Sequence, residues 1–197
     1  MIPRQIESSG QFEQVPLVFE PGSYAELFAL KNNKSLAETF AHRRYTRLRD
    51  RLSDRYRDRL SEPLGEFLKS LKDADDQNYK LFLNKNGDLQ YCRFKLAGPA
   101  YASKKGVYCY SVDDQLTYVG RCRDSMKKRI DQGYGKIHPK NCYIDGQSTN
   151  CHLNARIATV SKRVTLWLCS MDEDASIIAN ESALIRQLSP PWNVQKQ

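Results

Sequence analysis

Two tyrosines in the second half of the chain belong to nearly mirrored tripeptides, Gly-Val-Tyr at 106–108 and Tyr-Val-Gly at 118–120. We expect the two glycines to permit close backbone approach or an irregular strand end. The residues around both tripeptides are rich in Val, Tyr and Thr, and an Asp-Asp pair between them is typical of a turn, so the pattern predicts a β-hairpin. If the hairpin is symmetric about Asp113, Tyr108 and Tyr118 lie opposite each other and share one face. A phenol, whose ordinary pKa is about 10, becomes a useful base when a nearby cation favours its ionised form.

Three more polar residues follow in segments with helix or turn signals. An Asp-Ser pair is an N-cap signal for a short helix that carries Arg129. Glu181 lies within 177–188, where apolar residues recur on one helical face, and Asn193 follows Pro-Pro-Trp. A guanidinium holds two phosphate oxygens and a carboxylate is a hard ligand for Mg²⁺, so these residue types suit chemistry on a phosphate ester.

The order of these pieces resembles the GIY-YIG nuclease family: Gly-Val-Tyr, Tyr-Val-Gly, a Lys-Lys-Arg-Ile segment, a Glu in an apolar helix, and an Asn after a Pro-containing turn. The resemblance covers roughly residues 104–194 and leaves the preceding part of the chain outside it. It implies an α/β (α+β) fold with a small mixed three-stranded sheet flanked by helices. It also implies phosphodiester hydrolysis that depends on Mg²⁺, for which Mn²⁺ can substitute.

The resemblance gives each matched residue an expected role. Tyr108 is the general base or orients the attacking water, and Tyr118 assists through its hydroxyl. Arg121 contacts the scissile phosphate, and Arg123 is a second candidate for that contact. Arg129 is the catalytic arginine that offsets the charge growing on the phosphoryl group. Glu181 is the main protein ligand of the metal ion.

Two points stay open within the resemblance. Asn193 either fixes the local backbone or contacts the site. Many family members place a His or Tyr one helical turn after the catalytic arginine, whereas this chain has Gly133 there. Tyr134, Lys136 or His138 is expected to supply the missing group from a differently shaped loop, and the sequence does not choose among the three.

Helix signals dominate the part of the chain before residue 75. Ser35 followed by Glu38 is a capping-box signature, and it opens a long helix whose apolar stripe recurs at helical spacing up to residue 60. Pro63 ends that helix, and a second helix is expected over 64–73.

A second hairpin is expected before the tyrosine motifs. The strand-like runs 79–84 and 89–96 flank an Asn-Gly pair, which favours a tight turn. We therefore expect two domains: a helical and hairpin extension over 1–103 with a role in DNA binding or dimerisation, and a catalytic domain over 104–197.

Arginines are concentrated in the predicted long helix, where eight stand against three aspartates. One interpretation is a solvated surface with ion pairs between helical turns. The other is a surface that follows a DNA backbone, because guanidinium groups grip phosphate oxygens and release counterions. The candidates for phosphate contact are Arg43, Arg44, Arg47, Arg51 and Arg55.

The segment 135–155 is polar and contains Gly and Asn, which predicts a long loop inserted between Arg129 and Glu181. Amide, hydroxyl and imidazole groups read base edges, so this insertion is a candidate for sequence recognition. The alternative is a loop whose polar groups satisfy only its own backbone. The candidates for DNA contact are Lys136, Gln147, Ser148, Thr149, Asn150, His152 and Asn154.

Bulk properties agree with a nucleic-acid partner without identifying one. The net charge of +8 favours phosphate-bearing ligands. Six cysteines include no Cys-x-x-Cys pair, and the spacing of Cys142, Cys151 and His152, with His138 nearby, is a poor match to a structural zinc site. No long apolar stretch resembles a signal peptide or a membrane span, so a reduced, cytoplasmic protein is expected.

The sequence therefore predicts an endonuclease that acts on double-stranded DNA and resembles the restriction-type members of the family. One site per chain favours a homodimer or sequential nicking for cleavage of both strands. The alternatives are a structure-selective or single-strand-selective nuclease, an RNA nuclease, and a DNA-binding module that has kept the fold but not the reaction.

Overall fold

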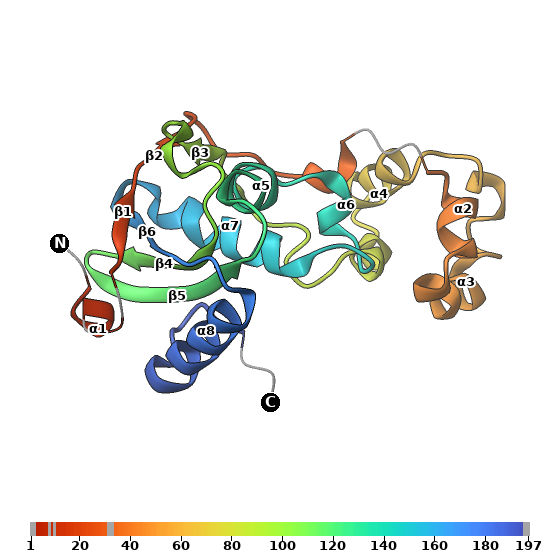
Figure 1. The fold of residues 1–197 in the computed structure, drawn as a ribbon. Coiled ribbons are helices and arrows are strands. Elements are labelled where there is room, and N and C mark those ends of the chain that lie inside the picture. Colours follow the sequence, from red (N-terminus) through yellow and green to blue (C-terminus); the bar gives the residue numbers. More distant parts are fainter. Residues whose placement is uncertain (1–2, 8, 10, 31–33, 195–197) are drawn as a thin grey trace. The chain divides into compact units, whose positions relative to one another are not determined.

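The computed structural model describes residues 3–7, 9, 11–30 and 34–194 (Figure 1). The chain forms two compact units, each built from segments that are far apart in the sequence. The sheet unit contains Met1–Gly22, Cys92–Lys136 and Arg156–Gln197, and the helical unit contains Ser23–Tyr91 and Ile137–Ala155. The division expected at residue 103 falls inside the sheet unit.

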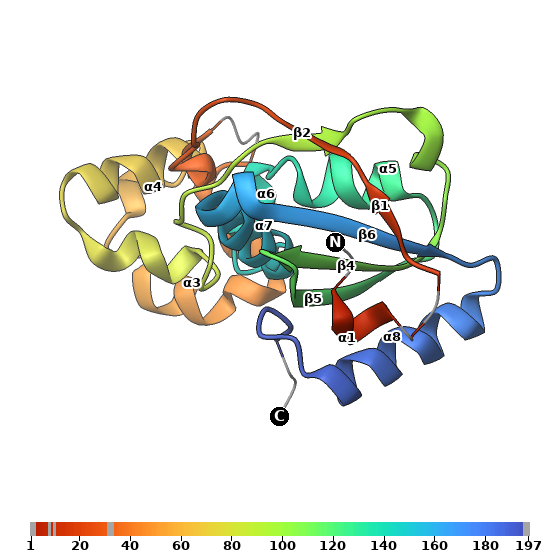
Figure 2. The same ribbon diagram turned by 90° about the vertical axis from the view of Figure 1, so that its left-hand side faces the viewer.

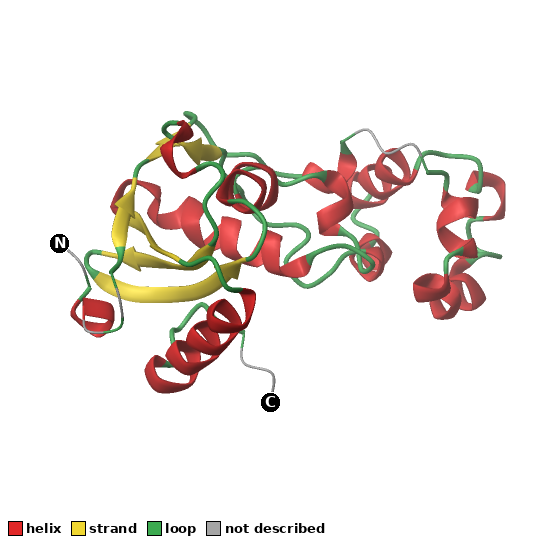
Figure 3. Cartoon of the chain, viewed as in Figure 1, coloured by secondary structure: helices red, strands yellow, loops and turns green. Residues whose placement is uncertain are grey.

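The main sheet of the sheet unit has four strands in the order β1-β6-β4-β5, and all neighbours pair antiparallel. The prediction of a mixed three-stranded sheet was wrong, because a strand near the N-terminus pairs with β6 and no pair among the described strands of this sheet is parallel. The α/β class itself is confirmed, with helices and strands in one chain (Figure 3). The four strands are β1 (Glu13–Val15), β4 (Gly106–Val112), β5 (Gln115–Cys122) and β6 (Val164–Ser170).

The hairpin expected around the Asn-Gly pair is not formed. Strand β3 (Phe94–Leu96) pairs instead with β2 (Leu17–Phe19) in a separate two-stranded sheet. The other expected strand lies largely in the 3-10 helix Gln77–Phe82. Tyr79 and Phe82 are both buried there, and a spacing of three residues puts both on one side of a 3-10 helix. Core packing thus overrides the local strand signal.

The hairpin of β4 and β5 has the expected strands but not the expected register. Both aspartates of its turn have positive φ, 49° and 61°, as a two-residue hairpin turn requires. The register then shifts between Tyr110 and Ser111, so Tyr118 pairs with Tyr110, and Tyr108 pairs with Gly120. The symmetric register was therefore wrong by two residues, a shift that keeps Tyr108 and Tyr118 on one face because side chains alternate with a period of two.

Helices cover both faces of the main sheet, as Figures 1 and 2 show. On one face, α1 (Arg4–Glu7) and α8 (Asp174–Leu188) pack on β4 and β5 through a core that includes Ile6, Val107, Val119, Ile177 and Leu184. The other face carries the tyrosines and the helical segment that begins with α5 (Met126–Arg129). No helix among the described residues is long and apolar enough to cross a membrane.

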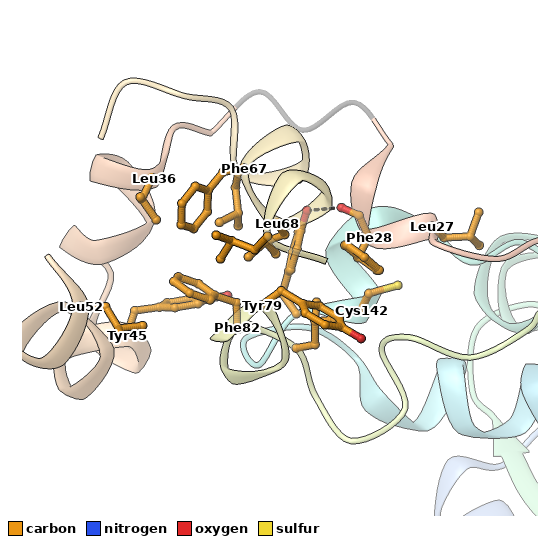
Figure 4. Close-up of a cluster of buried hydrophobic side chains, with 14 of the residues drawn as sticks. Leu27, Phe28, Leu36, Tyr45, Leu52, Phe67, Leu68, Tyr79, Phe82 and Cys142 are labelled. Atoms are coloured by element: carbon orange, nitrogen blue, oxygen red, sulfur yellow. Dashed lines mark hydrogen bonds between the residues drawn. The ribbon is translucent and has the colours of Figure 1, made fainter. Parts of the chain in front are cut away.

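The helical unit is organised around α4, whose bounds are those predicted from the sequence. Its residues Leu64, Phe67, Leu68 and Leu71 are buried and form part of a larger apolar core (Figure 4). Four α-helices of the described residues belong wholly to this unit: α2 (Leu36–Ala41), α3 (Thr46–Leu52), α4 (Leu64–Asp73) and α6 (Pro139–Cys142).

The predicted long helix is divided, although its start is confirmed. Ser35 and Glu38 form the reciprocal bonds of a capping box. The helix ends at Ala41 because His42 is extended, and the His42 side chain then accepts a hydrogen bond from the backbone N of Arg44 at 3.4 Å. This second cap starts a new turn, so the apolar stripe reaches the core along a bent path rather than along one helix.

The expected loop over 135–155 was also wrong. Helix α6 and most of helix α7 (Ser148–Val160) occupy it, and α7 continues from the helical unit into the sheet unit at residue 156. Asn150 and Asn154 are buried on α7 together with Leu153 and Ile157. Because polar residues occupy buried positions, the apolar periodicity that announces a helix is weak in this segment.

Candidate active site

The two glycines of the tyrosine motifs provide space, at Gly106 in the way that the sequence led us to expect. Gly106 has a φ of +147°, and a Cβ there would overlap the carbonyl oxygen of Cys169 on β6. A Cβ at Gly120 would lie 2.5 Å from the hydroxyl oxygen of Tyr108. Gly106 therefore permits close approach of β6, and Gly120 makes room for the phenol of Tyr108.

Three tyrosine hydroxyls meet on the face opposite α8, and we call Tyr108, Tyr118 and Tyr134 the tyrosine cluster. The hydroxyl oxygen of Tyr134 lies 2.8 Å from that of Tyr108 and 3.3 Å from that of Tyr118. The three side chains are 1%, 8% and 2% exposed for Tyr108, Tyr118 and Tyr134. One hydroxyl thus bridges the two motif tyrosines inside a largely closed space.

A π-helix explains how Tyr134 reaches this position despite Gly133. The π-helix Ile130–Tyr134 follows α5 directly, and the backbone N of Gly135 donates to the carbonyl of Ile130, five residues earlier. One π turn after Arg129 is therefore Tyr134, whereas one α turn would end at Gly133. Of the three substitutes named from the sequence, Tyr134 is the one that the fold brings to the motif tyrosines.

Strand β3 fixes the π-helix in place. The backbone N of Leu96 donates to the Asp131 carboxylate at 2.8 Å, and the backbone N of Phe94 donates to the carbonyl of Gly135 at 3.1 Å. These bonds hold both ends of the irregular turn. The position of Tyr134 is thus set by residues that carry none of the expected chemistry.

Burial keeps the phenols of Tyr108 and Tyr118 protonated. It raises the pKa of Tyr108 well above the usual value; Tyr134 and Tyr118 add to the shift and Arg129 opposes it. Burial also raises the pKa of Tyr118, and Tyr134 and the carboxylate of Glu181 add to that rise. The chain alone therefore does not produce the phenolate that a strong base requires.

Arg129 brings a positive charge to the cluster and stays accessible. Its guanidinium carbon lies 5.9 Å from the centre of the Tyr134 ring, a cation–π distance. The Arg129 side chain is exposed, and among the described residues it forms no ion pair with a carboxylate. An arginine held beside a buried cluster without an acidic partner retains its donors for an anion.

Arg121 and Glu181 form an ion pair on the other side of the edge strand β5. Nη1 of Arg121 donates to Oε2 of Glu181, whose side chain is 15% exposed against 40% for Arg121. Glu181 projects from α8, which packs on β5. Because its charge raises the pKa of Tyr118, the carboxylate lies within electrostatic range of the tyrosine cluster.

The carboxylate of Glu181 fits a Mg²⁺ site of a limited kind. One oxygen is used by Arg121, and within the described ranges the other accepts no hydrogen bond. No group of three or more His, Cys, Asp or Glu side chains comes together among the residues that the structure describes. Mg²⁺ is often held by one or two carboxylates with water and substrate phosphate completing the shell, so Glu181 suits an ion shared with substrate.

Asn193 forms two hydrogen bonds with the backbone of β5. Its Oδ1 accepts from the N of Val119 at 2.9 Å, and its Nδ2 donates to the O of Val119 at 2.8 Å. The backbone N of Trp192 donates to the O of Thr117 at 2.9 Å. The C-terminal turn thus covers the free edge of β5, and the side-chain amide of Asn193 is used for holding the backbone next to Tyr118.

The remaining residues expected at the catalytic site lie elsewhere. Lys136 is exposed at the end of its segment of the sheet unit. His138 belongs to the helical unit, where its backbone N is bonded to the Asn141 side chain at 2.9 Å at the start of α6. Arg123, two residues after Arg121, pairs with Asp174 at 3.9 Å.

The candidates on and before α7 are mostly engaged within the protein. Asn154 is fully buried and Asn150 is 6% exposed, so neither presents its amide to a base edge. The Asn150 amide donates to Gln147 at 2.8 Å, and Ser148 accepts from Asn86 at 3.0 Å. Only Thr149 and Gln147 of the α7 set are exposed, and His152 is half-buried.

The arginines of the helical unit divide into paired and unpaired groups. Arg49, Arg55, Arg57 and Arg59 form ion pairs with nearby acids. Among the described residues, Arg43, Arg47 and Arg51 form none, and all three are exposed. Arg47 and Arg51 lie four residues apart in α3, which places them on one side of that helix, and Arg43 lies in the 3-10 turn just before it.

Sequence reasoning missed Tyr110. Its ring centre lies 6.2 Å from that of Tyr108 and 6.3 Å from that of Tyr118, and its side chain is fully buried. The Tyr110 hydroxyl has no hydrogen-bond partner among the described residues. The signal was present, because Tyr110 is two residues from Tyr108 and a strand places such residues on one face.

Comparison of the chain with protein-family models, with curated proteins and with solved structures found no match.

Proposed function

We propose that this protein is a Mg²⁺-dependent endonuclease that hydrolyses phosphodiester bonds in double-stranded DNA. The observation that carries the proposal is the single hydroxyl of Tyr134 bonded to both motif tyrosines beside the unpaired Arg129. The proposal agrees with the resemblance to GIY-YIG nucleases, which rests on Tyr108, Tyr118 and other residues of that motif order.

In this proposal, the tyrosine cluster holds and moves a proton. Tyr118 is the most exposed member and faces the substrate, while Tyr134 connects it to Tyr108. A cation held by Glu181 would favour loss of the Tyr118 proton to solvent, and the Tyr118 phenolate would then take one proton from the attacking water and become a neutral phenol again. The hydroxyl of Tyr134 donates to that phenolate, and this hydrogen-bonded row of three hydroxyls stabilises it. Arg129 binds the phosphate and stabilises its growing negative charge.

When substrate binds, the ion pair of Arg121 and Glu181 opens and each side chain takes a new partner. Glu181 would hold Mg²⁺, which would supply polarisation of the phosphate and stabilisation of the leaving oxygen. Arg121, once released from Glu181, turns its guanidinium to the phosphate that has entered. Because Arg121 is 40% exposed, this movement does not require opening of the core.

The unpaired arginines of the helical unit provide the DNA-backbone contacts in this proposal. Within the described part of the chain, Arg43, Arg47 and Arg51 have no acid to release, whereas Arg57 would first have to leave Asp54. We expect Arg47→Gln to lower the slope of log affinity against log salt by about 0.9. The matched Arg57→Gln variant changes the slope less, as measured by fluorescence anisotropy on a DNA duplex at several salt concentrations.

The test of the proposed activity is cleavage of plasmid DNA by the wild type and by Glu181→Ala. Discrete fragments with Mg²⁺, absent with chelator and in the variant, support a sequence-specific endonuclease, and nicks or smears support a less specific one. Glu173→Ala, at the start of the same helix, is the matched control and retains activity. Loss of activity in both variants, or cleavage that persists in Glu181→Ala, contradicts the assigned role.

A second candidate is a DNA-binding module without catalysis. The observation that favours it is the closed state of the site: the phenols bond to one another and Glu181 is paired with Arg121. Duplex binding that survives in a protein without cleavage at any Mg²⁺ or Mn²⁺ concentration selects this candidate.

A further inference from the structure

We infer that the helical unit contains a binding pocket for a nucleotide, in which the base enters the cavity and the phosphate stays at the rim. This inference does not depend on the proposed hydrolysis. The cavity measures about 50 Å³ and lies where α2, the turn after it, the start of α4 and the segment after α6 meet. It is lined by Lys34, Thr39, His42, Tyr45, Leu64, Lys140, Tyr143 and Asp145.

The walls of the cavity are suited to a flat ring. Tyr45, Leu64 and Tyr143 line it and are all at least 97% buried, so they belong to the fixed core of the unit. At roughly 10–15 Å³ of cavity volume for each water, the cavity holds about four waters. Together these waters have a size comparable to that of a pyrimidine ring. Aromatic and aliphatic walls stabilise a base by stacking and by exclusion of water.

Hydrogen-bond accounting shows which groups remain for a ligand. The Tyr45 hydroxyl donates to Asp145 Oδ1 at 2.7 Å, and the Tyr143 hydroxyl donates to the carbonyl of Phe28 at 2.6 Å. The Thr39 hydroxyl donates to the carbonyl of Ser35 at 2.8 Å. The three hydroxyls are therefore used, whereas the second oxygen of Asp145 accepts no hydrogen bond among the residues that the structure describes.

The carboxylate of Asp145 selects a ligand with an N–H donor. Burial, followed by the bond to Asp145, raises the pKa of Tyr45, so Tyr45 stays a donor and holds the carboxylate in one orientation. The free oxygen then accepts from a ring N–H or an exocyclic amine, groups that nucleobases present on their Watson–Crick edge. A ligand that presents only hydrogen-bond acceptors would form no hydrogen bond with the acceptor oxygen of Asp145, and binding would leave that oxygen unsatisfied.

The rim supplies the charge that a phosphate requires. Lys140 lines the cavity, is exposed, and forms no ion pair among the described residues. Arg44 is anchored next to Asp145 because its Nη1 donates to the carbonyl of Ile144 at 3.1 Å, and its other N–H groups remain. A carboxylate at the cavity and cations at its rim match the two ends of a nucleoside monophosphate.

An amino acid is the main competing ligand, because its ammonium group would pair with Asp145 and its carboxylate with Lys140. The nucleotide is favoured by the aromatic walls, which a small aliphatic ligand does not use, and by Arg43, Arg47 and Arg51 in the same unit. Those unpaired arginines suit a ligand that continues as a nucleic-acid strand, whose other phosphates lie outside the pocket.

The test is saturation-transfer NMR on the full chain with each of the four deoxynucleoside 5′-monophosphates, with inorganic phosphate and with free amino acids. We expect base protons of at least one monophosphate to receive saturation. Asp145→Asn and Lys140→Gln should each weaken that ligand by about tenfold, since each removes a charged hydrogen-bond partner. The control Lys85→Gln, an exposed lysine of the same unit, should leave binding unchanged.

Three results overturn the inference: no monophosphate binds, inorganic phosphate competes while base protons stay unsaturated, or an amino acid binds in place of the nucleotides. Equal affinity in Lys140→Gln and the wild type also overturns it, and this variant changes an exposed side chain, so folding does not obscure the result. Loss of plasmid cleavage has no bearing on these outcomes, because the ligands contain no bond that is cut in the assay.

Discussion

The tyrosine cluster of the sheet unit and the pocket of the helical unit use their polar groups in opposite ways. In the cluster, Tyr108 and Tyr118 both bond to Tyr134, so the hydroxyls satisfy one another. In the pocket, Tyr45 uses its hydroxyl to orient Asp145, and a charged oxygen is left over. A closed network fixes protons, whereas spare charged groups bind ligands. Whether a tyrosine hydroxyl is already bonded, and to which group, therefore decides the chemistry of each region more than the number of tyrosines does.

The largest expected effect separates two tyrosines of the same strand. Tyr108→Phe removes a hydroxyl bonded to Tyr134, and on the proposed function it lowers the rate of DNA cleavage by about 10²- to 10⁴-fold. Tyr110→Phe removes a hydroxyl without a partner among the described residues, so it leaves the rate within about twofold and does not destabilise the fold. Single-turnover cleavage and urea unfolding measure the two quantities.

An equal fall in the DNA cleavage rates of Tyr108→Phe and Tyr110→Phe would contradict this prediction. That result would show that the packing of the rings, and not the hydrogen-bonded row, determines activity. Circular dichroism of both variants provides the control for folding.

A smaller effect is expected from filling the space beside Tyr108. Gly120→Ala puts a Cβ 2.5 Å from the Tyr108 hydroxyl, and the overpacking lowers the free energy of unfolding by about 1–3 kcal/mol. Gly98→Ala is the control, because a Cβ there meets nothing within 4 Å and the residue is extended. Urea unfolding measures both, and equal stability of the two variants would contradict the close packing of the cluster.

Alkaline pH provides a test of burial in both regions. Burial raises the pKa of Tyr110 in the folded protein, and likewise that of Tyr45. A raised pKa contributes stability that is complete below the unfolded value of about 10 and is lost as pH rises above it. The free energy of unfolding should therefore fall above pH ~10, by at most about 1.4 kcal/mol per pH unit for each phenol.

The Phe variants identify the phenols responsible for that fall. Tyr110→Phe and Tyr45→Phe should each make the decline of stability between about pH 10 and pH 11.5 less steep than in the wild type, since each removes one group that ionises only on unfolding. Urea unfolding at several pH values measures the slope. An unchanged slope in Tyr110→Phe would indicate that this phenol ionises in the folded state.

The smallest expected effect concerns the ion pair at the border of the cluster. Arg121→Gln frees the Glu181 carboxylate from its partner, so Mn²⁺ binds about two- to fivefold more tightly, because a partly exposed ion pair contributes about 0.4–1 kcal/mol. Arg123→Gln is the control, because its pair with Asp174 spans 3.9 Å. Electron paramagnetic resonance of free Mn²⁺ measures the affinity without any cleavage, and weaker binding in Arg121→Gln would contradict competition for Glu181.

Local signals predicted the parts of this protein whose conformation is decided by neighbouring residues. The β4–β5 strands, the capping box at Ser35 and helix α4 follow from turn residues, capping chemistry and a strong apolar period. The close backbone approach at Gly106 was also predicted, because a glycine permits a contact that a Cβ would block. The room that Gly120 makes for the Tyr108 side chain was not predicted.

Signals that depend on distant partners were misleading. The strand-like run 79–84 became largely helical because Tyr79 and Phe82 are buried in the core of the helical unit. The polar segment 135–155 became mostly helical although Asn150 and Asn154 occupy buried positions. In both cases, burial against residues far along the chain outweighed the preferences of the segment itself.

The sequence by itself determined the order of the motif residues, the hairpin that carries Tyr108 and Tyr118, and the helix that carries Arg129, because each depends on interactions within a few residues. Three other features came from the tertiary structure. A π turn puts Tyr134, and not Gly133, next to Tyr108 and Tyr118. Glu181 is paired with Arg121, and Asp145 faces a cavity. Those features depend on the packing of segments brought together from different parts of the chain, and no local spacing contains that information.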